Sequence, residues 1–177
     1  FIKVYSDMRA TGSILSMKDI WWDLRPSPAY GTLEIRICDG TATLAELAAI
    51  TAYIHANAAY MRAEEQVEER PLPEVPTRWV LRENKWRALR YGLDTEVIDA
   101  HDLRVRPLRA TILDRLDRLA PWFRANGGEG ELALLRTLCA RGNSSDRQRA
   151  VYARTGQVED VARFNVREFE AGEPLWG

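Results

Sequence analysis

Polar and apolar residues alternate strictly over residues 32–38, which is the pattern of a strand with one buried face. Residues 21–25 alternate in the same way. The connection over residues 26–31 contains two prolines and a glycine, which favour a turn. We therefore predict an antiparallel hairpin over about residues 20–39. Its apolar face carries Leu33, Ile35 and Ile37.

The opposite face of this hairpin carries four charged side chains, Asp23, Arg25, Glu34 and Arg36. A solvated sheet surface tolerates such charges at little cost, and this interpretation stays open. Charges of both signs between bulky aromatic residues also suit a half-enclosed site. A carboxylate can bind Mg²⁺, and a guanidinium group can bind phosphate through paired hydrogen bonds. The residues alone leave both interpretations standing.

Helical signals dominate the chain after residue 40. Thr43 and Glu46 have the spacing of a capping box, which predicts a helix that begins at Leu44. We expect Pro121 to interrupt a later helix, because proline removes one backbone hydrogen bond. The predicted helical regions are residues 44–70, 78–91 and 111–170.

A short second hairpin is predicted between the last two helical regions, over residues 97–106. Together these elements predict an α+β fold with antiparallel hairpins and a mainly helical remainder. The 177 residues are enough for one ordinary domain with its own core, so we treat residues 1–177 as a single domain.

Composition excludes several classes of protein. A formal net charge of −1 argues against a general nucleic-acid or membrane-surface binder. No apolar run has the length of a membrane span, and the first residues do not resemble a signal peptide. Cys38 and Cys139 form no zinc-ligand motif or disulfide framework. We therefore expect a cytoplasmic protein with no nucleic-acid or membrane partner.

Two blocks of the hairpin resemble a known family. The runs Trp22-Asp23-Leu24-Arg25-Pro26 and Gly31-Thr32-Leu33-Glu34-Ile35-Arg36-Ile37-Cys38-Asp39 are similar to the signature of the bacterial glutamate–cysteine ligase type 2 family, which are ATP-dependent carboxylate–amine ligases. Residues 82–93 resemble a further segment of that family, and residues 141–149 match it more loosely. The resemblance covers about residues 21–170. It implies the C-terminal part of one catalytic domain in a longer enzyme, with a glutamine-synthetase-like sheet.

The resemblance also implies a reaction and its cofactors. ATP, with Mg²⁺, phosphorylates the carboxylate of glutamate or a similar acid, and an amine such as cysteine then displaces phosphate from the acyl phosphate. On this basis Glu34 is a Mg²⁺ ligand, and Arg36 contacts the phosphates. Arg25 helps to hold substrate or phosphate and shares the catalytic role of Arg36. Asn84 and Arg90 are expected to face the substrate cleft.

Several alternatives stay open at this point. The helix over residues 78–91 also suits a plain surface helix, with a salt bridge from Glu83 to Arg87. The family needs further glutamates from an N-terminal half, so we expect this chain alone to be inactive. A non-catalytic interaction protein, or one subunit of a split ligase completed by a companion chain, is the alternative function. An arginine-rich nucleic-acid module over residues 78–90 is disfavoured by the balanced charge. The acceptor amine and homo-oligomer formation are left open.

Overall fold

The computed structural model describes residues 1–65 and 77–176. Its contacts divide the chain into two compact units, which we call unit 1 (residues 1–40) and unit 2 (residues 41–177). Each unit is described by itself. Within the described residues, no helix combines the length and the apolar character that crossing a membrane requires.

Unit 1 contains a helix, a 3₁₀ turn and the predicted hairpin. Its elements are α1 (Ile2–Ala10), η1 (Met17–Asp19), β1 (Leu24–Ser27) and β2 (Thr32–Ile35). The strands pair antiparallel, which confirms the hairpin, although both are shorter than the alternation predicts. Two backbone hydrogen bonds close the turn. The Tyr30 amide donates to the carbonyl of Ser27, and the Gly31 amide donates to the carbonyl of Pro28. Gly31 has φ +61°, a conformation that glycine adopts without a steric cost.

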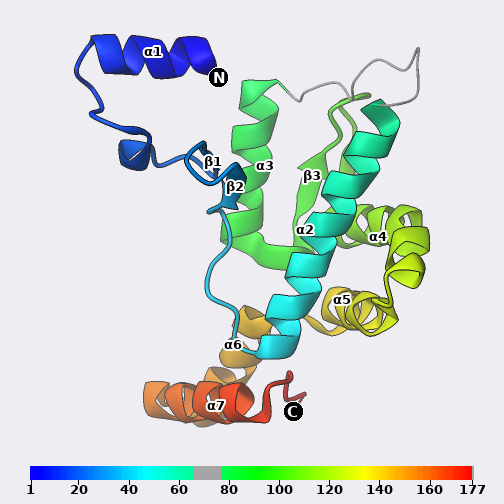
Figure 1. The fold of residues 1–177 in the computed structure, drawn as a ribbon. Coiled ribbons are helices and arrows are strands. Elements are labelled where there is room, and N and C mark those ends of the chain that lie inside the picture. The colour runs from blue at the N-terminus through cyan, green and yellow to red at the C-terminus, as the bar shows by residue number, and fades with distance from the viewer. Residues whose placement is uncertain (66–76, 177) are drawn as a thin grey trace. The chain divides into compact units, whose positions relative to one another are not determined.

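Unit 2 is mainly helical and contains the second hairpin (Figure 1). Strands β3 and β4 pair antiparallel, with Val97 opposite Arg106. With two sheets of two strands each and helices over most of the described chain, the α+β prediction is confirmed. The elements are α2 (Leu44–Glu65), α3 (Arg78–Tyr91), η2 (Gly92–Asp94), β3 (Glu96–Ile98), β4 (Val105–Pro107), α4 (Leu108–Ala125), α5 (Glu129–Arg141), α6 (Ser144–Thr155) and α7 (Val158–Ala171).

Helix α2 begins at the predicted residue, because the amide of Glu46 donates to the hydroxyl of Thr43 over 3.1 Å. The prediction of helix over residues 66–70 lies outside the described residues. Helix α3 has the predicted bounds, and Gly92 ends it with φ +62°. Local signals therefore suffice to place both helices.

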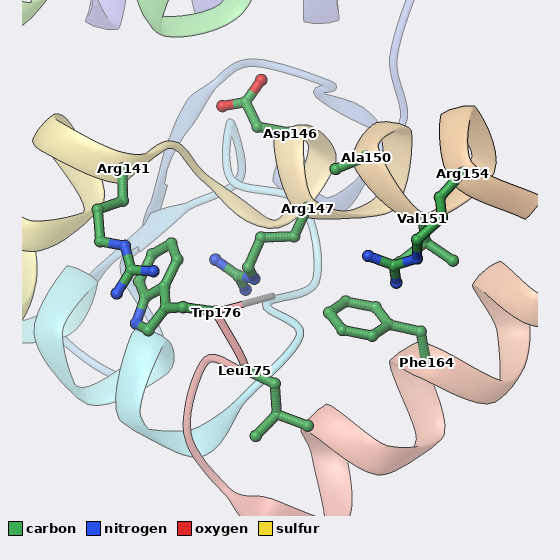
Figure 2. Close-up of a pocket in the computed structure, with 9 residues that line it drawn as sticks. All are labelled: Arg141, Asp146, Arg147, Ala150, Val151, Arg154, Phe164, Leu175 and Trp176. Carbon is green, nitrogen blue, oxygen red and sulfur yellow. The ribbon is translucent and has the colours of Figure 1, made fainter.

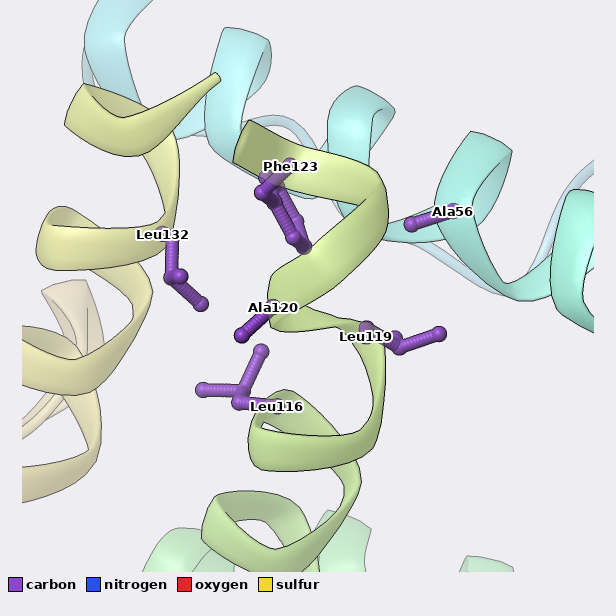
Figure 3. Packing of buried hydrophobic residues seen from close by; sticks show 6 residues of the cluster. All are labelled: Ala56, Leu116, Leu119, Ala120, Phe123 and Leu132. Carbon is purple, nitrogen blue, oxygen red and sulfur yellow. The ribbon is translucent and has the colours of Figure 1, made fainter. Parts of the chain in front are cut away.

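The core of unit 2 forms where α4 packs against α5 and α2 (Figure 3). One face of α4 supplies most of its side chains, at the spacing of three and four residues that an amphipathic helix requires. Ala56 of α2 has no exposed surface, and its small side chain lets α4 approach closely. The buried residues of this hydrophobic core are Ala56, Leu116, Leu119, Ala120, Phe123 and Leu132.

The expected break at Pro121 is wrong, because α4 continues through this residue to Ala125. Proline inside a helix costs about 3 kcal/mol through the lost hydrogen bond and its ring clash. Ala120 and Phe123, on either side of Pro121, are both buried in the core. Burial of one aromatic side chain offsets a cost of that size. Tertiary packing therefore overrides the local signal.

Candidate functional site

A pair of oppositely charged side chains lies at the centre of the hairpin in unit 1. Arg25 and Glu34 are direct cross-strand partners. Both Nε and Nη2 of Arg25 lie 2.6 Å from Oε2 of Glu34. The Nη1 group of Arg25 also donates to the carbonyl of Lys18 over 3.0 Å. These contacts hold the Arg25 guanidinium group in one orientation, since each of its three nitrogens has an acceptor.

Arg36 approaches the same carboxylate from the next position on this face. Its Nη1 lies 3.7 Å from Oε2 of Glu34, and its guanidinium group lies 4.9 Å from the ring centroid of Trp21. Its backbone amide donates to the carbonyl of Asp23 over 2.7 Å, which extends the hairpin pairing beyond β2. The structure thus brings Arg25, Glu34 and Arg36 together. We call these three side chains the hairpin cluster.

The hairpin cluster is open to ligands, because the Glu34 side chain keeps 46% of its surface and Arg36 keeps 26%. Two guanidinium groups outnumber the single carboxylate within this cluster, and guanidinium groups bind phosphate and carboxylate through paired hydrogen bonds. The arrangement can therefore hold an anionic group against Arg36 without breaking the bonds of Arg25.

Glu34 fits a magnesium site only as one ligand among several. Across residues 1–65 and 77–176, no group of three or more His, Cys, Asp or Glu side chains is placed to hold a metal ion. Magnesium in phosphate-transfer sites uses one or two protein carboxylates and takes its other ligands from phosphates and water. The donor set of unit 1 is compatible with that pattern, and the metal role of Glu34 stays a prediction.

Asn84 has a structural role in unit 2 that its expected substrate contact did not suggest. Its Nδ2 group donates to the carbonyl of Ile98 over 2.9 Å, and its Oδ1 atom accepts from the Ile98 amide over 2.8 Å. The Asn84 side chain thus forms the two backbone hydrogen bonds that a neighbouring strand would form, and it connects α3 to β3. Both polar atoms of the side-chain amide are thus engaged within the protein, and substrate binding by Asn84 stays a prediction.

Arg90, the other expected contact in unit 2, is exposed near the end of α3, and its guanidinium group lies 5.6 Å from the ring of Tyr91. One turn earlier, Nε of Arg87 lies 2.8 Å from Oε1 of Glu83, which is the pair that a surface helix predicts. An open hollow of about 600 Å³ lies along the same helix, between Trp79 and Trp86.

Sequence reasoning missed a buried ionic cluster in unit 2. Arg147 of α6 donates from Nε to Glu168 of α7 over 2.6 Å and from Nη2 to Glu46 of α2 over 2.9 Å. The partners are 21 and 101 residues away in the chain. Only the loose family match at residues 141–149 pointed to Arg147, and Glu46 was assigned to the helix cap alone. We call these three side chains the buried cluster.

Comparison with known proteins places the chain in a family. The model of Glutamate-cysteine ligase family 2 matches residues 1–163. A protein of Nocardia farcinica named "Putative glutamate--cysteine ligase 2-2" is 42% identical over 165 residues, which cover 93% of this chain and 43% of that protein. Proteins named "Putative glutamate--cysteine ligase 2" from Gloeobacter violaceus and Bdellovibrio bacteriovorus are 40% and 38% identical, over 92% and 96% of this chain and 42% and 44% of their own lengths.

The chain thus spans less than half the length of these relatives. The family match includes all of unit 1, and therefore the whole hairpin cluster, together with Asn84, Arg90 and Arg147 in unit 2. The chain belongs to glutamate–cysteine ligase family 2.

Proposed function

We propose that this chain is part of an ATP-dependent carboxylate–amine ligase that forms a γ-glutamyl amide bond. The observation that carries the proposal is the hairpin cluster, which lies within the residues that match the ligase family. An enzyme of this kind must hold a phosphoryl group while it moves from ATP to a carboxylate. A guanidinium group beside a carboxylate supplies groups of the kind that this transfer needs.

The proposed reaction has two steps. An oxygen of the substrate γ-carboxylate bonds to the γ-phosphorus of ATP, and the bond to the β–γ bridging oxygen breaks, which gives an acyl phosphate and ADP. The amine nitrogen then bonds to the acyl carbon, and phosphate leaves with the bonding electrons while the amine loses a proton. A bound Mg²⁺ ion neutralises charge on the ATP phosphates.

Each residue of the hairpin cluster has a distinct role in this proposal. Arg36 binds the transferred phosphoryl group, because its guanidinium group is not saturated by Glu34. Glu34 supplies one carboxylate oxygen to the metal. Arg25 orients Glu34 through its two short contacts and adds positive charge near the phosphates. In unit 2, Arg90 is proposed to bind an anionic group of a substrate, because its exposed guanidinium group is accessible to ligands.

The acid is proposed to be glutamate or a close analogue, and the amine is proposed to be cysteine or a similar amine. Further nucleotide and metal contacts come from protein outside this chain, because the chain spans less than half of its relatives. On this basis the chain alone is inactive.

A split ligase, in which a companion chain supplies the missing part, is a second candidate. The apolar side chains of the hairpin favour it, since Leu24, Leu33 and Ile37 keep 49%, 56% and 55% of their surface. Apolar residues on a two-stranded hairpin are normally covered by further strands or helices. Co-purification of this chain with a second polypeptide, and ADP release by that complex alone, is the expected result for a split enzyme.

Glu34→Gln in the complete enzyme tests the proposal. The amide keeps the size of the side chain but removes the charge that binds Mg²⁺, so ADP formation with glutamate and an amine panel should fall by about 100-fold or more. Far-UV circular dichroism should stay unchanged.

Glu170→Gln is the matched control for this experiment. It makes the same chemical change at an exposed position of α7, and activity should stay within about twofold. Near-normal turnover of Glu34→Gln would show that Glu34 is structural and that the proposed metal role is wrong.

A further inference from the structure

A cavity of about 180 Å³ lies in unit 2, between α6, α7 and the C-terminal residues (Figure 2). Three arginines line it, Arg141 at the end of α5 and Arg147 and Arg154 on α6. Phe164 of α7 and Trp176 supply aromatic walls. Three guanidinium groups around one small cavity repel each other unless negative charge lies between them.

Of these three arginines, only Arg147 bonds directly to carboxylates of the described residues. Its guanidinium group is bonded to Glu168 and Glu46, and both carboxylates are buried with it. Its Nη1 group is buried yet has no hydrogen-bond partner in the described part of the chain. A buried guanidinium N–H without an acceptor is unfavourable, so a further oxygen near this group would be stabilising.

The other two arginines have no carboxylate partner among residues 1–65 and 77–176. Arg141 lies 4.6 Å from the ring of Trp176, and Arg147 lies 5.0 Å from the same ring. Trp176 therefore contacts two cations, as Figure 2 shows.

Asp146 is the acidic residue in the cavity wall, and it is already engaged. Its carboxylate accepts from the Asn143 amide over 2.9 Å and lies 2.6 Å from Nη2 of Arg149. With Asp146 balanced by Arg149 and the two glutamates balanced by two of the three lining arginines, one positive charge is left over. The cavity thus matches a ligand with a single negative charge.

We propose that this cavity binds a small oxyanion, either orthophosphate or a short carboxylate. Guanidinium groups bind both through paired hydrogen bonds. A volume of about 180 Å³ is below the roughly 300–1,000 Å³ of sites for drug-sized ligands, so the cavity suits a small ion. The site belongs wholly to unit 2 and does not rest on the ligase reaction proposed for the hairpin cluster.

Isothermal titration calorimetry of the complete protein tests the site. Orthophosphate and acetate are titrated separately at constant ionic strength set with chloride, and at least one of them should bind saturably. Saturation by orthophosphate identifies a phosphate site, and saturation by acetate identifies a carboxylate site. Saturation by neither overturns the proposal.

Two variants and one matched control locate the binding. Arg141→Gln and Arg154→Gln remove exposed arginines of the cavity wall without disturbing a recorded ion pair, and each should weaken binding at least tenfold. Arg124→Gln makes the same change at an exposed arginine of α4, outside the cavity, and affinity should stay within twofold. Unchanged affinity in both cavity variants would place the anion elsewhere and overturn the proposal, whether or not the protein retains ligase activity.

Discussion

The two units differ in how far their apolar side chains are buried. In unit 2, apolar residues of α2, α4 and α5 are buried against one another in a continuous core. In unit 1, Leu24, Leu33 and Ile37 of the hairpin keep about half of their surface. A two-stranded hairpin is marginally stable in water unless something covers its apolar face. The residues proposed for catalysis therefore lie on the unit that has the weaker core of its own.

The charged clusters show the same difference. The side chains of Arg147 and Glu168 keep 5% and 0% of their surface, so the buried cluster holds α2, α6 and α7 together with little contact to solvent. Glu34 is nearly half exposed in the hairpin cluster. Similar ion pairs thus serve stability when they are buried and leave room for ligand binding when they are exposed.

The largest effect is expected in the core of unit 2. Phe123→Ala leaves a cavity where a fully buried ring was, and should lower the free energy of unfolding by about 3–5 kcal/mol. Leu33→Ala in the hairpin is the matched truncation at a half-exposed position, and it should cost less than about 1 kcal/mol. Urea unfolding followed by circular dichroism measures both. Equal losses would contradict the contrast between the units.

Removal of the buried arginine should have an effect of similar size. Arg147→Leu leaves two carboxylates buried without their cation, which should cost about 3–5 kcal/mol. The triple variant with Glu46→Gln and Glu168→Gln removes the uncompensated charge and should regain much of that loss. If the triple variant is no more stable than Arg147→Leu in urea unfolding, charge burial is not the cause.

Variants at two positions of α3 should affect stability and activity separately. Asn84→Ala leaves the backbone groups of Ile98 without their partners and should lower stability by about 1–3 kcal/mol. Arg90→Ala should leave stability within about 0.5 kcal/mol, because the side chain is exposed, yet it should raise the KM for substrate in the complete enzyme. Thermal unfolding and steady-state kinetics on both variants test this division. The reverse pattern would assign Asn84 to the substrate site.

The smallest effect concerns acid stability of unit 1. Hydrogen bonds from the backbone amides of Leu15 and Ser16 lower the pKa of Asp19 below its ordinary value of 3.8. A lowered pKa means that the ionised form stabilises the fold above the ordinary pKa, and that this contribution is lost as the pH falls through the lowered value. NMR titration of the Asp19 carboxyl group should show a midpoint below 3.8.

Asp19→Asn should remove this pH dependence, with Asp7→Asn as the exposed aspartate control in the same unit. A stability difference between wild type and Asp19→Asn that persists below the midpoint would show that the carboxylate charge is not responsible.

Much of the fold followed from local signals. The alternation over residues 32–38 predicted the hairpin, and the Thr43–Glu46 spacing predicted the start of α2. The prediction of a helix break at Pro121 was wrong, because the local cost of this proline is offset by core contacts with residues far away in the chain. The shared polar face of Arg25, Glu34 and Arg36 was predictable, because strand periodicity alone sets which face each side chain takes.

The sequence by itself determined the family, the two hairpins, the start of α2 and both ends of α3, since these depend on residue types at short and regular spacings. It placed the start of the last helical region at residue 111, whereas α4 begins at Leu108. Only the tertiary structure decided that the buried carboxylates of Glu46 and Glu168 both meet Arg147. The sequence identified Glu46 only as a helix-cap residue. In the structure one oxygen of its carboxylate accepts from Thr43, and the other binds Arg147, 101 residues away. No local pattern encodes such a contact, because it depends on how α2, α6 and α7 pack once their apolar faces are buried.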